Sequence, residues 1–431
     1  MLIAPERGAI LPTPILQRPK RATPVIALLV IAVLINYVDR GNLALAAPLL
    51  SKERGLSTSQ LGILLSAFFW TYVLLQVPVG WLVDRFSANA VLAAGFFAWS
   101  AATIFTGLSR GFTALLAMRL LLGVGEAVIF PASSKIFSES IEEKDRGLAN
   151  GLLVAAIRWG TAVGAFGGGL MMAHFGWRKT FLAIGVAGLL WLPAWLRWKP
   201  APMPREAAHF RDDQPSFASS FATIVRRRSF WGASIGHLGS NYLLYFLMSW
   251  LPFYLVQERH LSTSAMAWTA GMIYAIDSTA AIVTGRIADL WIRRGASACS
   301  ARKWPMAVGL LIAVVSLLGC AAAGPRTWLV FLIGAAVGCG TAGSGIYAVP
   351  QTLAGPQLAG RWVGMQNCIA NCSGIVAPAL TGFLVQRTGH FSAAFAFAAA
   401  VAAVGVLAWI TGVRPSDDPA PLRDVVFSEA L

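Results

Sequence analysis

Long apolar stretches recur along the whole chain of 431 residues. Each is close to the about 20 residues that an α-helix needs to cross a lipid bilayer. Hydrophobic residues make up 57% of the sequence and charged residues only 12%, roughly half of the charged fraction of a soluble domain. In the hydrocarbon core a backbone must satisfy its own polar groups, so stretches of this kind fold as helices. The sequence therefore predicts an all-α membrane protein with many crossings.

Twelve predicted helices fall into two sets of six, separated by a polar connection. They cover residues 25–47, 60–82, 90–108, 113–137, 147–171, 179–198, 230–256, 266–288, 304–322, 327–350, 361–386 and 391–412. The predicted domains are an N-terminal tail (1–24), a first bundle (25–198), a central loop (199–229), a second bundle (230–412) and a C-terminal tail (413–431). The first apolar run is long and lacks a small-residue cleavage site after it, so it is not predicted to be a cleaved signal peptide.

Lys and Arg are concentrated on one side of this topology, where the central loop holds the run Arg226, Arg227 and Arg228. By the positive-inside rule, both tails are predicted to be cytoplasmic. The location expected for this bacterial-looking chain is the plasma membrane, the inner membrane of a bacterium. The formal charge of +15 then reflects a basic inner face, and no nucleic-acid partner is expected.

The two halves of the sequence repeat one short pattern. GWLVDR, residues 80–85, ends the second predicted helix, and GRIADL, residues 285–290, ends the eighth. Gly and Asp are four residues apart in both copies. A Gly and an Asp near a helix end are common capping residues, but two copies in matching positions indicate an internal repeat. Parallel repeats of this kind are typical of transporters whose substrate site lies between the halves.

Four stretches of the sequence resemble a known family. GWLVDRFSAN is similar to the loop signature of the major facilitator superfamily, which begins Gly-x-x-x-Asp-Arg, although Ala88 and Asn89 stand where Gly and basic residues are usual. NYVDRGNL (36–43), RLLLGVGEAVIFPA (119–132) and PQTLAGPQLAGRWVGMQNCIANCSGIVAPALTG (350–382) resemble its anion:cation symporters. That branch includes permeases for sugar acids such as galactonate and glucarate, and carriers of sialic acid and glutamate. The resemblance covers most of residues 25–412 and implies the major facilitator fold, two pseudo-symmetric six-helix bundles.

An Asp–Arg pair, Asp39 and Arg40, interrupts the first predicted helix. At ~1.5 Å per residue, Arg40 lies roughly 23 Å above the cytoplasmic edge, Arg119 ~9 Å below the outer edge and Glu126 ~20 Å below it. Arg40 and Arg119 are thus expected at one level, with Glu126 deeper. Ionisable residues at this depth mark substrate pathways, and two guanidinium groups at one level repel each other unless an anion lies between them. We predict that both bind a substrate carboxylate. The alternative for Asp39 and Arg40 is an ion pair that only fixes helix packing.

The intramembrane acids are expected to carry protons. A carboxyl in a dry site tends to be neutral, while a neighbouring Arg favours its charged form, so such a group can bind and release a proton during transport. The resemblance implies that Asp39 and Glu126 couple transport to protons. It also implies that Asn371 lines the substrate site. No cofactor is expected, because the proton gradient would be the driving force.

Other polar intramembrane residues leave alternatives open. Tyr72 and Tyr347 can hydrogen-bond a sugar acid or serve as packed core residues. Arg158 is a third intramembrane guanidinium, where the resembling family more often has an uncharged polar residue, and Asp277 is an extra acid. These two either pair across the halves, or Arg158 holds a second carboxylate.

The paired loop motifs predict gating residues at the cytoplasmic ends of the second and eighth helices. These residues are Asp84, Arg85 and Asp289.

The predicted function is secondary active transport: proton-coupled uptake of a small organic anion such as a sugar acid, by alternating access. The alternative is an exporter or antiporter of drugs or other small molecules. An enzyme is not expected, because the sequence contains no phosphate-binding loop and no cluster of metal ligands. Cys368 and Cys372 are four residues apart but lack further soft ligands, so no metal site is predicted. The expected partners are the anion, protons and the lipid bilayer, and the chain is expected to function as a monomer.

Overall fold

Regular secondary structure in the described residues is helical throughout, which confirms the all-α prediction. The computed structural model describes residues 22–414 except 142, 201–216, 323 and 325. Its elements are α1 (Ala22–Arg54), α2 (Thr58–Arg85), α3 (Ala88–Leu108), α4 (Phe112–Glu126), α5 (Ile129–Ser140), α6 (Glu143–Val163), the π-helix η1 (Gly164–Gly168), α7 (Gly169–Leu189), α8 (Trp191–Trp198), α9 (Phe217–Val225), α10 (Arg228–Gln257), α11 (Thr263–Arg293), α12 (Ala298–Ala322), α13 (Trp328–Gly343), α14 (Ala348–Thr388) and α15 (Ser392–Gly412).

The helices account for twelve membrane crossings. Ten segments of the described chain are long and apolar enough to span a bilayer. One of them, Ala155–Trp198, has 44 residues and contains a break at Gly176, where φ is 78°, so it supplies two crossings. The 30-residue α10 has spanning length but is not among the ten, because its Ser, His and Asn residues lower its hydropathy. Counting Ala155–Trp198 as two crossings and adding α10 brings the ten segments to twelve crossings.

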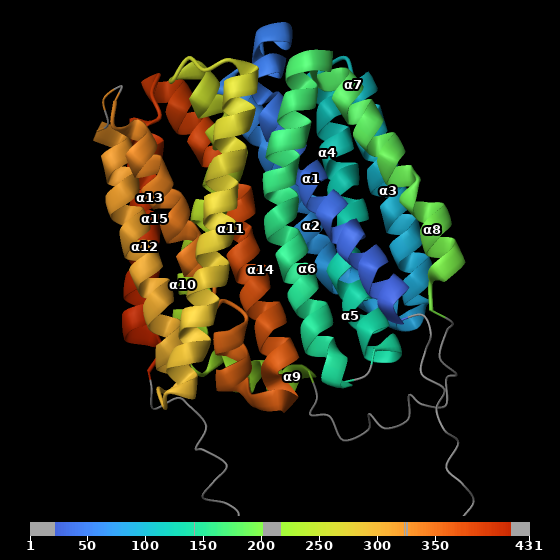
Figure 1. Ribbon diagram of the computed structural model, residues 1–431, viewed down its shortest axis with the longest axis vertical. Helices are drawn as coiled ribbons and strands as arrows, with labels where there is room; N and C mark the ends of the chain where they lie inside the picture. The colour runs from blue at the N-terminus through green and yellow to red at the C-terminus, as the bar shows by residue number, and fades with distance from the viewer. Residues whose placement is uncertain (1–21, 142, 201–216, 323, 325, 415–431) are drawn as a thin grey trace, which may run out of the picture.

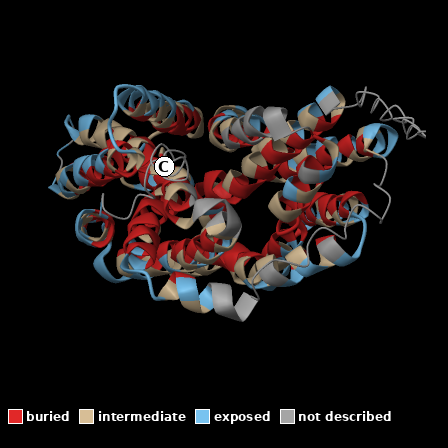
Figure 2. Ribbon diagram, turned by 90° about the horizontal axis from the view of Figure 1, so that it is seen from below, coloured by how far each residue is buried: buried red, intermediate tan, exposed pale blue. Residues whose placement is uncertain are grey.

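Two bundles stand side by side, α1 to α8 in one and α10 to α15 in the other (Figure 1). The name "tail end" is used below for the face of the molecule where α1 begins and α15 ends. The name "loop end" is used for the opposite face, where α1 ends and α2 begins. Viewed from the tail end, buried residues lie where helices face each other, and exposed residues form the rim (Figure 2). Short α9 lies inside the stretch 199–229, which was expected to be a loop.

The internal repeat is visible in how α2 and α11 begin. Leu-Ser-Thr-Ser precedes or opens both helices, at residues 56–59 and 261–264. The Ser57 hydroxyl accepts from the N–H of Gln60 at 3.2 Å, and the Ser262 hydroxyl accepts from the N–H of Ala265 at 3.2 Å. Each serine satisfies one of the N–H groups that a first helical turn leaves free. The two bundles thus start their second helices in the same way.

Glycines let α1 and α6 approach closely, and this approach positions the site. A Cβ at Gly160 would lie 2.9 Å from the Cβ of Tyr37, and one at Gly164 would lie 3.0 Å from the Cα of Val38. The π-helix η1 follows directly in the glycine-rich sequence GAFGG. Small residues at these points allow backbone-to-backbone packing within a bilayer.

The two bundles meet closely at the loop end, through α2 and α14. A Cβ at Gly62 would lie 2.7 Å from the carbonyl oxygen of Pro378, and a Cβ at Gly382 would overlap the carbonyl oxygen of Thr58. The backbone N–H of Ser59 donates to Oε1 of Gln386 at 3.0 Å, again from one bundle to the other. The loop end is therefore closed in this structure.

We expect Gly382→Ala to separate the bundles at the loop end, because its Cβ would meet backbone, which cannot move aside as a side chain can. The separation can be measured as the distance between two spin labels by pulsed electron paramagnetic resonance. The labels are attached to cysteines introduced at the exposed positions Lys52 and Arg387, and the exposed Cys368 and Cys372 are changed to Ser. Gly364→Ala, on the same helix with open space around it, is the matched control. The label distance should shift to longer values only in Gly382→Ala. Equal distributions in the two variants would contradict closure by glycine packing.

Candidate functional site

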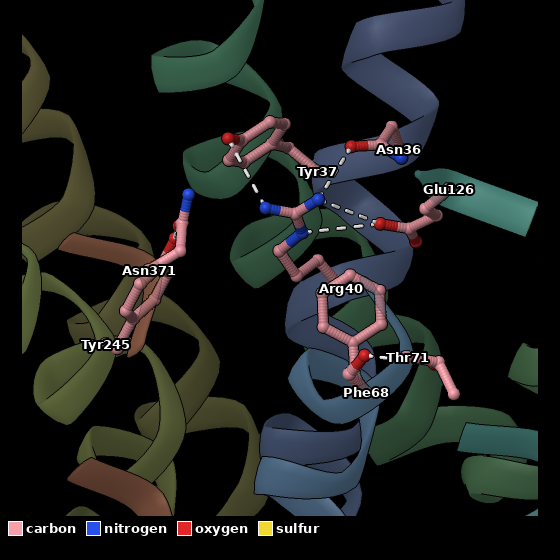
Figure 3. A network of polar contacts seen from close by, with 8 residues as sticks. All are labelled: Asn36, Tyr37, Arg40, Phe68, Thr71, Glu126, Tyr245 and Asn371. Atoms are coloured by element: carbon pink, nitrogen blue, oxygen red, sulfur yellow. Dashed lines mark hydrogen bonds and ion pairs between the residues drawn. The ribbon is translucent and has the colours of Figure 1, made fainter. Parts of the chain in front are cut away.

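Arg40 of α1 is the centre of a buried polar network between the bundles (Figure 3). Its Nη2 donates to Oε2 of Glu126 on α4 at 3.0 Å, and its Nε donates to the same oxygen at 3.3 Å. Weaker bonds run from Nη2 to Oδ1 of Asn36 at 3.4 Å and from Nη1 to the hydroxyl of Tyr37 at 3.5 Å. The side chains of the ion pair are only 3% and 0% exposed. At such burial, either charge alone would carry a large desolvation cost.

Three aromatic rings surround the Arg40 guanidinium. Its Cζ lies 4.7 Å from the ring centroid of Tyr37, 4.8 Å from that of Phe68 and 4.8 Å from that of Tyr72. Phe68 and Tyr72, one helical turn apart on α2, stack at 5.2 Å. The π faces attract the cation and fix its plane. The structure thus places the predicted site residue Tyr72 directly against Arg40.

Arg119 of α4 lies beside this network but has different partners. Its Nε donates to the carbonyl oxygen of Leu64 at 3.2 Å, and its Cζ lies 5.2 Å from the Phe68 centroid. The sequence did not predict that Glu126 meets Arg40, because Glu126 was expected to lie deeper than the level shared by Arg40 and Arg119. Side chains lean toward the N-terminus of their own helix, and α1 and α4 run in opposite directions. Arg40 therefore leans toward the tail end and Glu126 toward the loop end, where they meet.

Asp39 is not paired with its neighbour Arg40. Consecutive helical residues project about 100° apart, and Asp39 faces away from Arg40 toward α3. Nδ2 of Asn42 donates to Oδ1 of Asp39 at 3.5 Å, and Thr103 is close by. Within the described residues Asp39 forms no salt bridge, so the alternative of an Asp39–Arg40 ion pair is not what the structure shows.

The second bundle contributes an amide and two phenols. The hydroxyl of Tyr245 on α10 donates to Oδ1 of Asn371 on α14 at 2.6 Å, which leaves the amide nitrogen on the side of the first bundle (Figure 3). Tyr347, in the turn between α13 and α14, donates to Oδ1 of Asn367 at 3.4 Å. Its side chain is 42% exposed although it lies between helices. Open space therefore reaches Tyr347 between the bundles.

Arg158 and Asp277 pair across the two bundles, which is one of the two alternatives that the sequence left open for these residues. Nη1 of Arg158 on α6 donates to Oδ2 of Asp277 on α11 at 2.8 Å. The hydroxyl of Ser278 donates to the backbone oxygen of Arg158 at 3.2 Å. One bond between side chains and one from a side chain to the backbone thus connect α6 to α11 at this level.

The predicted gating residues lie away from this network. Arg85 is exposed at the tail end, with its Cζ 5.5 Å from the Trp81 ring. Asp289 is exposed and lines an open groove with Arg286 and Arg293. The side chain of Asp84 lies outside the described residues. A gating role for the three stays a prediction.

Sequence reasoning did not single out Asn36, Tyr37 and Phe68 as site residues. Asn36 and Tyr37 could have been identified from their spacing, because they precede Arg40 by four and three residues and so share its helix face. Phe68 precedes Tyr72 by four residues in the same way. The hydrogen bond from Tyr245 to Asn371 had no comparable signal, because the two residues are far apart in the sequence. As for metals, the described part of the chain has no group of three or more His, Cys, Asp or Glu placed to hold an ion.

The fold and this site agree with one family. The model of the Major Facilitator Superfamily matches residues 29–301 and 296–426. The chain belongs to the Major Facilitator Superfamily. As a member of this superfamily it is a multi-pass membrane transporter and not an enzyme, as the sequence predicted.

Relatives and solved structures of the superfamily match over most of the chain. The chain is 30% identical to the probable L-galactonate transporter of Escherichia coli, over 96% of each sequence. It is 28% identical to a probable galactarate/D-glucarate transporter of Bacillus subtilis, over 91% of each, and 28% to the hexuronate transporter of that species, over 92% of this chain and 96% of the relative. A bacterial homologue of the lysosomal transporter Spinster has the same fold, with a TM-score of 0.78 at 20% identity, covering 94% of this chain and 99% of the homologue.

We expect the Arg40–Glu126 pair to be essential for stability, because Glu126→Leu leaves a buried guanidinium unpaired. Loss of one partner of a buried pair costs about 3–5 kcal/mol, whereas an exposed pair contributes about 0–1 kcal/mol. Glu139→Leu, at a half-exposed acid 3.9 Å from Lys135, is the matched control. Thermal unfolding in detergent should show a large drop in midpoint for Glu126→Leu and a small one for the control. Similar midpoints would contradict the importance of the pair.

Proposed function

We propose that this transporter carries a small organic anion, such as a sugar acid or another carboxylate, together with protons into the cell. The observation that carries the proposal is the Arg40–Glu126 pair, a buried guanidinium whose counter-ion is a titratable carboxyl. Support comes from the similar proteins described above, which are named as transporters of galactonate, galactarate, D-glucarate and hexuronate.

Substrate binding is a competition for Arg40. A carboxylate that enters the space between the bundles would replace Glu126 on the guanidinium and gain two parallel hydrogen bonds. Tyr37, Tyr72 and Asn371 surround this point with two hydroxyls and an amide that can bind sugar hydroxyls. Arg119, which contacts Leu64 and Phe68 of α2 in the same bundle, adds positive charge to this region and is proposed to act with Arg40.

Proton coupling follows from the same competition. When Glu126 takes up a proton it releases Arg40, because a neutral carboxyl binds a guanidinium much more weakly than a charged one does. Its Oε1 has no hydrogen-bond partner within the described residues and is free to hold that proton. Asp39, buried without an Arg partner, is the second proposed proton site, and the two acids titrate together. The proton gradient is the proposed driving force, with no cofactor.

Alternating access would expose the network to each side in turn. The structure is closed at the loop end, so the complementary state requires the glycine contacts between α2 and α14 to open. Asp84, Arg85 and Asp289 are proposed to stabilise closure of the tail end in that other state. By the distribution of Lys and Arg, the tail end faces the cytoplasm, and we propose a bacterial inner membrane and a monomeric carrier.

A drug or cation exporter is the competing function. Cationic cargo requires acids that are free of Arg, yet Glu126 and Asp277 are both bound by guanidinium groups. The acid without an Arg partner, Asp39, faces α3 within the first bundle rather than the second bundle. The site therefore favours an anion.

Glu126→Gln should separate binding from coupling, because the amide imitates the protonated acid permanently. We expect substrate counterflow in proteoliposomes to persist while accumulation driven by a proton gradient is lost. Glu139→Gln, outside the network, is the control and should retain both activities. Gradient-driven accumulation in Glu126→Gln would move coupling to another acid, and loss of counterflow would make Glu126 a binding residue.

Arg119→Lys tests the second guanidinium, because Lys keeps the charge but loses the planar fork. We expect carboxylate binding to weaken roughly tenfold or more, the value of one charged hydrogen bond. Arg110→Lys, at an exposed loop-end position, is the matched control. Isothermal titration of purified protein with a panel of aldonates and aldarates measures both. Unchanged affinity in Arg119→Lys would exclude Arg119 from the binding site.

A further inference from the structure

Arg158 carries hydrogen-bond donors that its partner does not use. Asp277 occupies Nη1 alone, and within the described part of the chain Nε and Nη2 donate to no acceptor. These two nitrogens form one edge of the guanidinium, the edge that matches the two oxygens of a carboxylate. The Arg158 side chain is 16% exposed, compared with 3% for Arg40. The salt bridge between the bundles uses only Nη1, so the edge formed by Nε and Nη2 is left for another acceptor.

Gly343 lies directly beside that edge, where a residue with a side chain would not fit. A Cβ at Gly343 would overlap Nη2 of Arg158. Gly343 is also the last residue of α13, where the helix ends before the turn at 344–347. The carbonyl groups at a helix C-terminus favour a nearby cation. Arg158 is thus extended from the first bundle to a helix end of the second, and Asp277 holds it there.

Arg158 and Arg40 flank the same phenols. Tyr37 is in contact with Arg40, and Tyr37 also packs against α6 at Gly160, within electrostatic range of Arg158. Tyr347, exposed to the space between the bundles, is within range of both guanidinium groups. Two cationic groups therefore face one accessible space from different helices, with hydroxyls between them.

The pair with Asp277 is not required to join the bundles at this level. The bond from the Ser278 hydroxyl to the backbone oxygen of Arg158 connects α6 and α11 independently of the guanidinium. A Cβ at Gly271 of α11 would lie only 2.6 Å from ring atoms of Phe166, so α11 and η1 are also tightly packed. The ion pair can therefore serve to orient Arg158.

We propose that Arg158 is a second anion-binding group, positioned by Asp277, and that it selects substrates with an anionic group at both ends. This rests on the proposed function, in which Arg40 binds one carboxylate. A six-carbon aldarate has a carboxylate at each end and hydroxyls between, which matches two guanidinium groups separated by phenols. The matching aldonate has a primary alcohol in place of the second carboxylate and would use Arg40 alone.

The test compares galactonate with galactarate, which differ only at C6, by titration of the purified full-length protein in detergent. For Arg158→Gln we expect galactarate affinity to fall roughly tenfold to hundredfold, as for a lost charged hydrogen-bond pair, with galactonate changed less than about threefold. Arg158→Lys should recover only part of this loss, because Lys lacks the bidentate edge. Asp277→Asn should reduce galactarate affinity less than Arg158→Gln does, because the guanidinium remains.

A purely structural ion pair predicts a different pattern. Either Arg158→Gln or Asp277→Asn would then weaken both ligands equally and lower the unfolding midpoint by the same amount, and this result would overturn the inference. Galactonate binding without any galactarate binding in the unaltered protein would also overturn it, while the proposed function would stand. Binding of neither ligand, nor of any other aldonate or aldarate, would instead refute the proposed function.

Discussion

A guanidinium group buried between helix bundles must have a counter-charge, and the arrangement of this transporter's centre depends on that requirement. Arg40 is positively charged at all accessible pH values, so its environment has to supply the compensation. Glu126 provides the charge, Asn36 an additional acceptor and three aromatic rings the polarizable walls. These groups come from α1, α2 and α4, so the pair also determines how three helices of the first bundle face the second.

The same requirement recurs between the bundles. Arg158 originates in the first bundle and its counter-ion Asp277 in the second. A pair within one bundle, such as Arg40–Glu126, moves as a rigid unit when the bundles rock. A pair across the bundles experiences any change in their separation. The two pairs therefore respond to different events. The Arg40–Glu126 pair responds to binding of ligand and proton. The Arg158–Asp277 pair also responds to changes in the relative position of the two bundles. The hydrogen bond from the Ser278 hydroxyl to the backbone oxygen of Arg158 limits that second response to small movements near mid-membrane.

The fold could be predicted from the sequence because a bilayer allows few solutions. Apolar length gave the crossings, and the motifs in residues 36–43 and 119–132 located the charged centre. The sequence could not give the pairing of side chains. Depth counted along helix axes placed Glu126 below Arg40 and did not predict their contact, because the count ignores the length and direction of the side chains. Arg158 and Asp277 stayed unassigned for a different reason, since their contact depends on the register of α6 against α11. The hydrogen bond from Tyr245 to Asn371 could not be predicted, because it joins segments that share no local pattern.

Charge balance links the two pairs to the kind of cargo. The centre contains three guanidinium groups, Arg40, Arg119 and Arg158, and three carboxyl groups, Asp39, Glu126 and Asp277. Asp39 has no Arg partner among the described residues and is the second proposed proton site, so it carries no charge when protonated. The centre then has one excess positive charge, enough for one bound carboxylate. A proton on Glu126 adds a second, enough for two. A monoanion would thus be neutralised with Glu126 charged, whereas a dianion would be neutralised only with Glu126 protonated. The arrangement that releases Arg40 for binding is therefore the one that best tolerates a substrate with two negative ends.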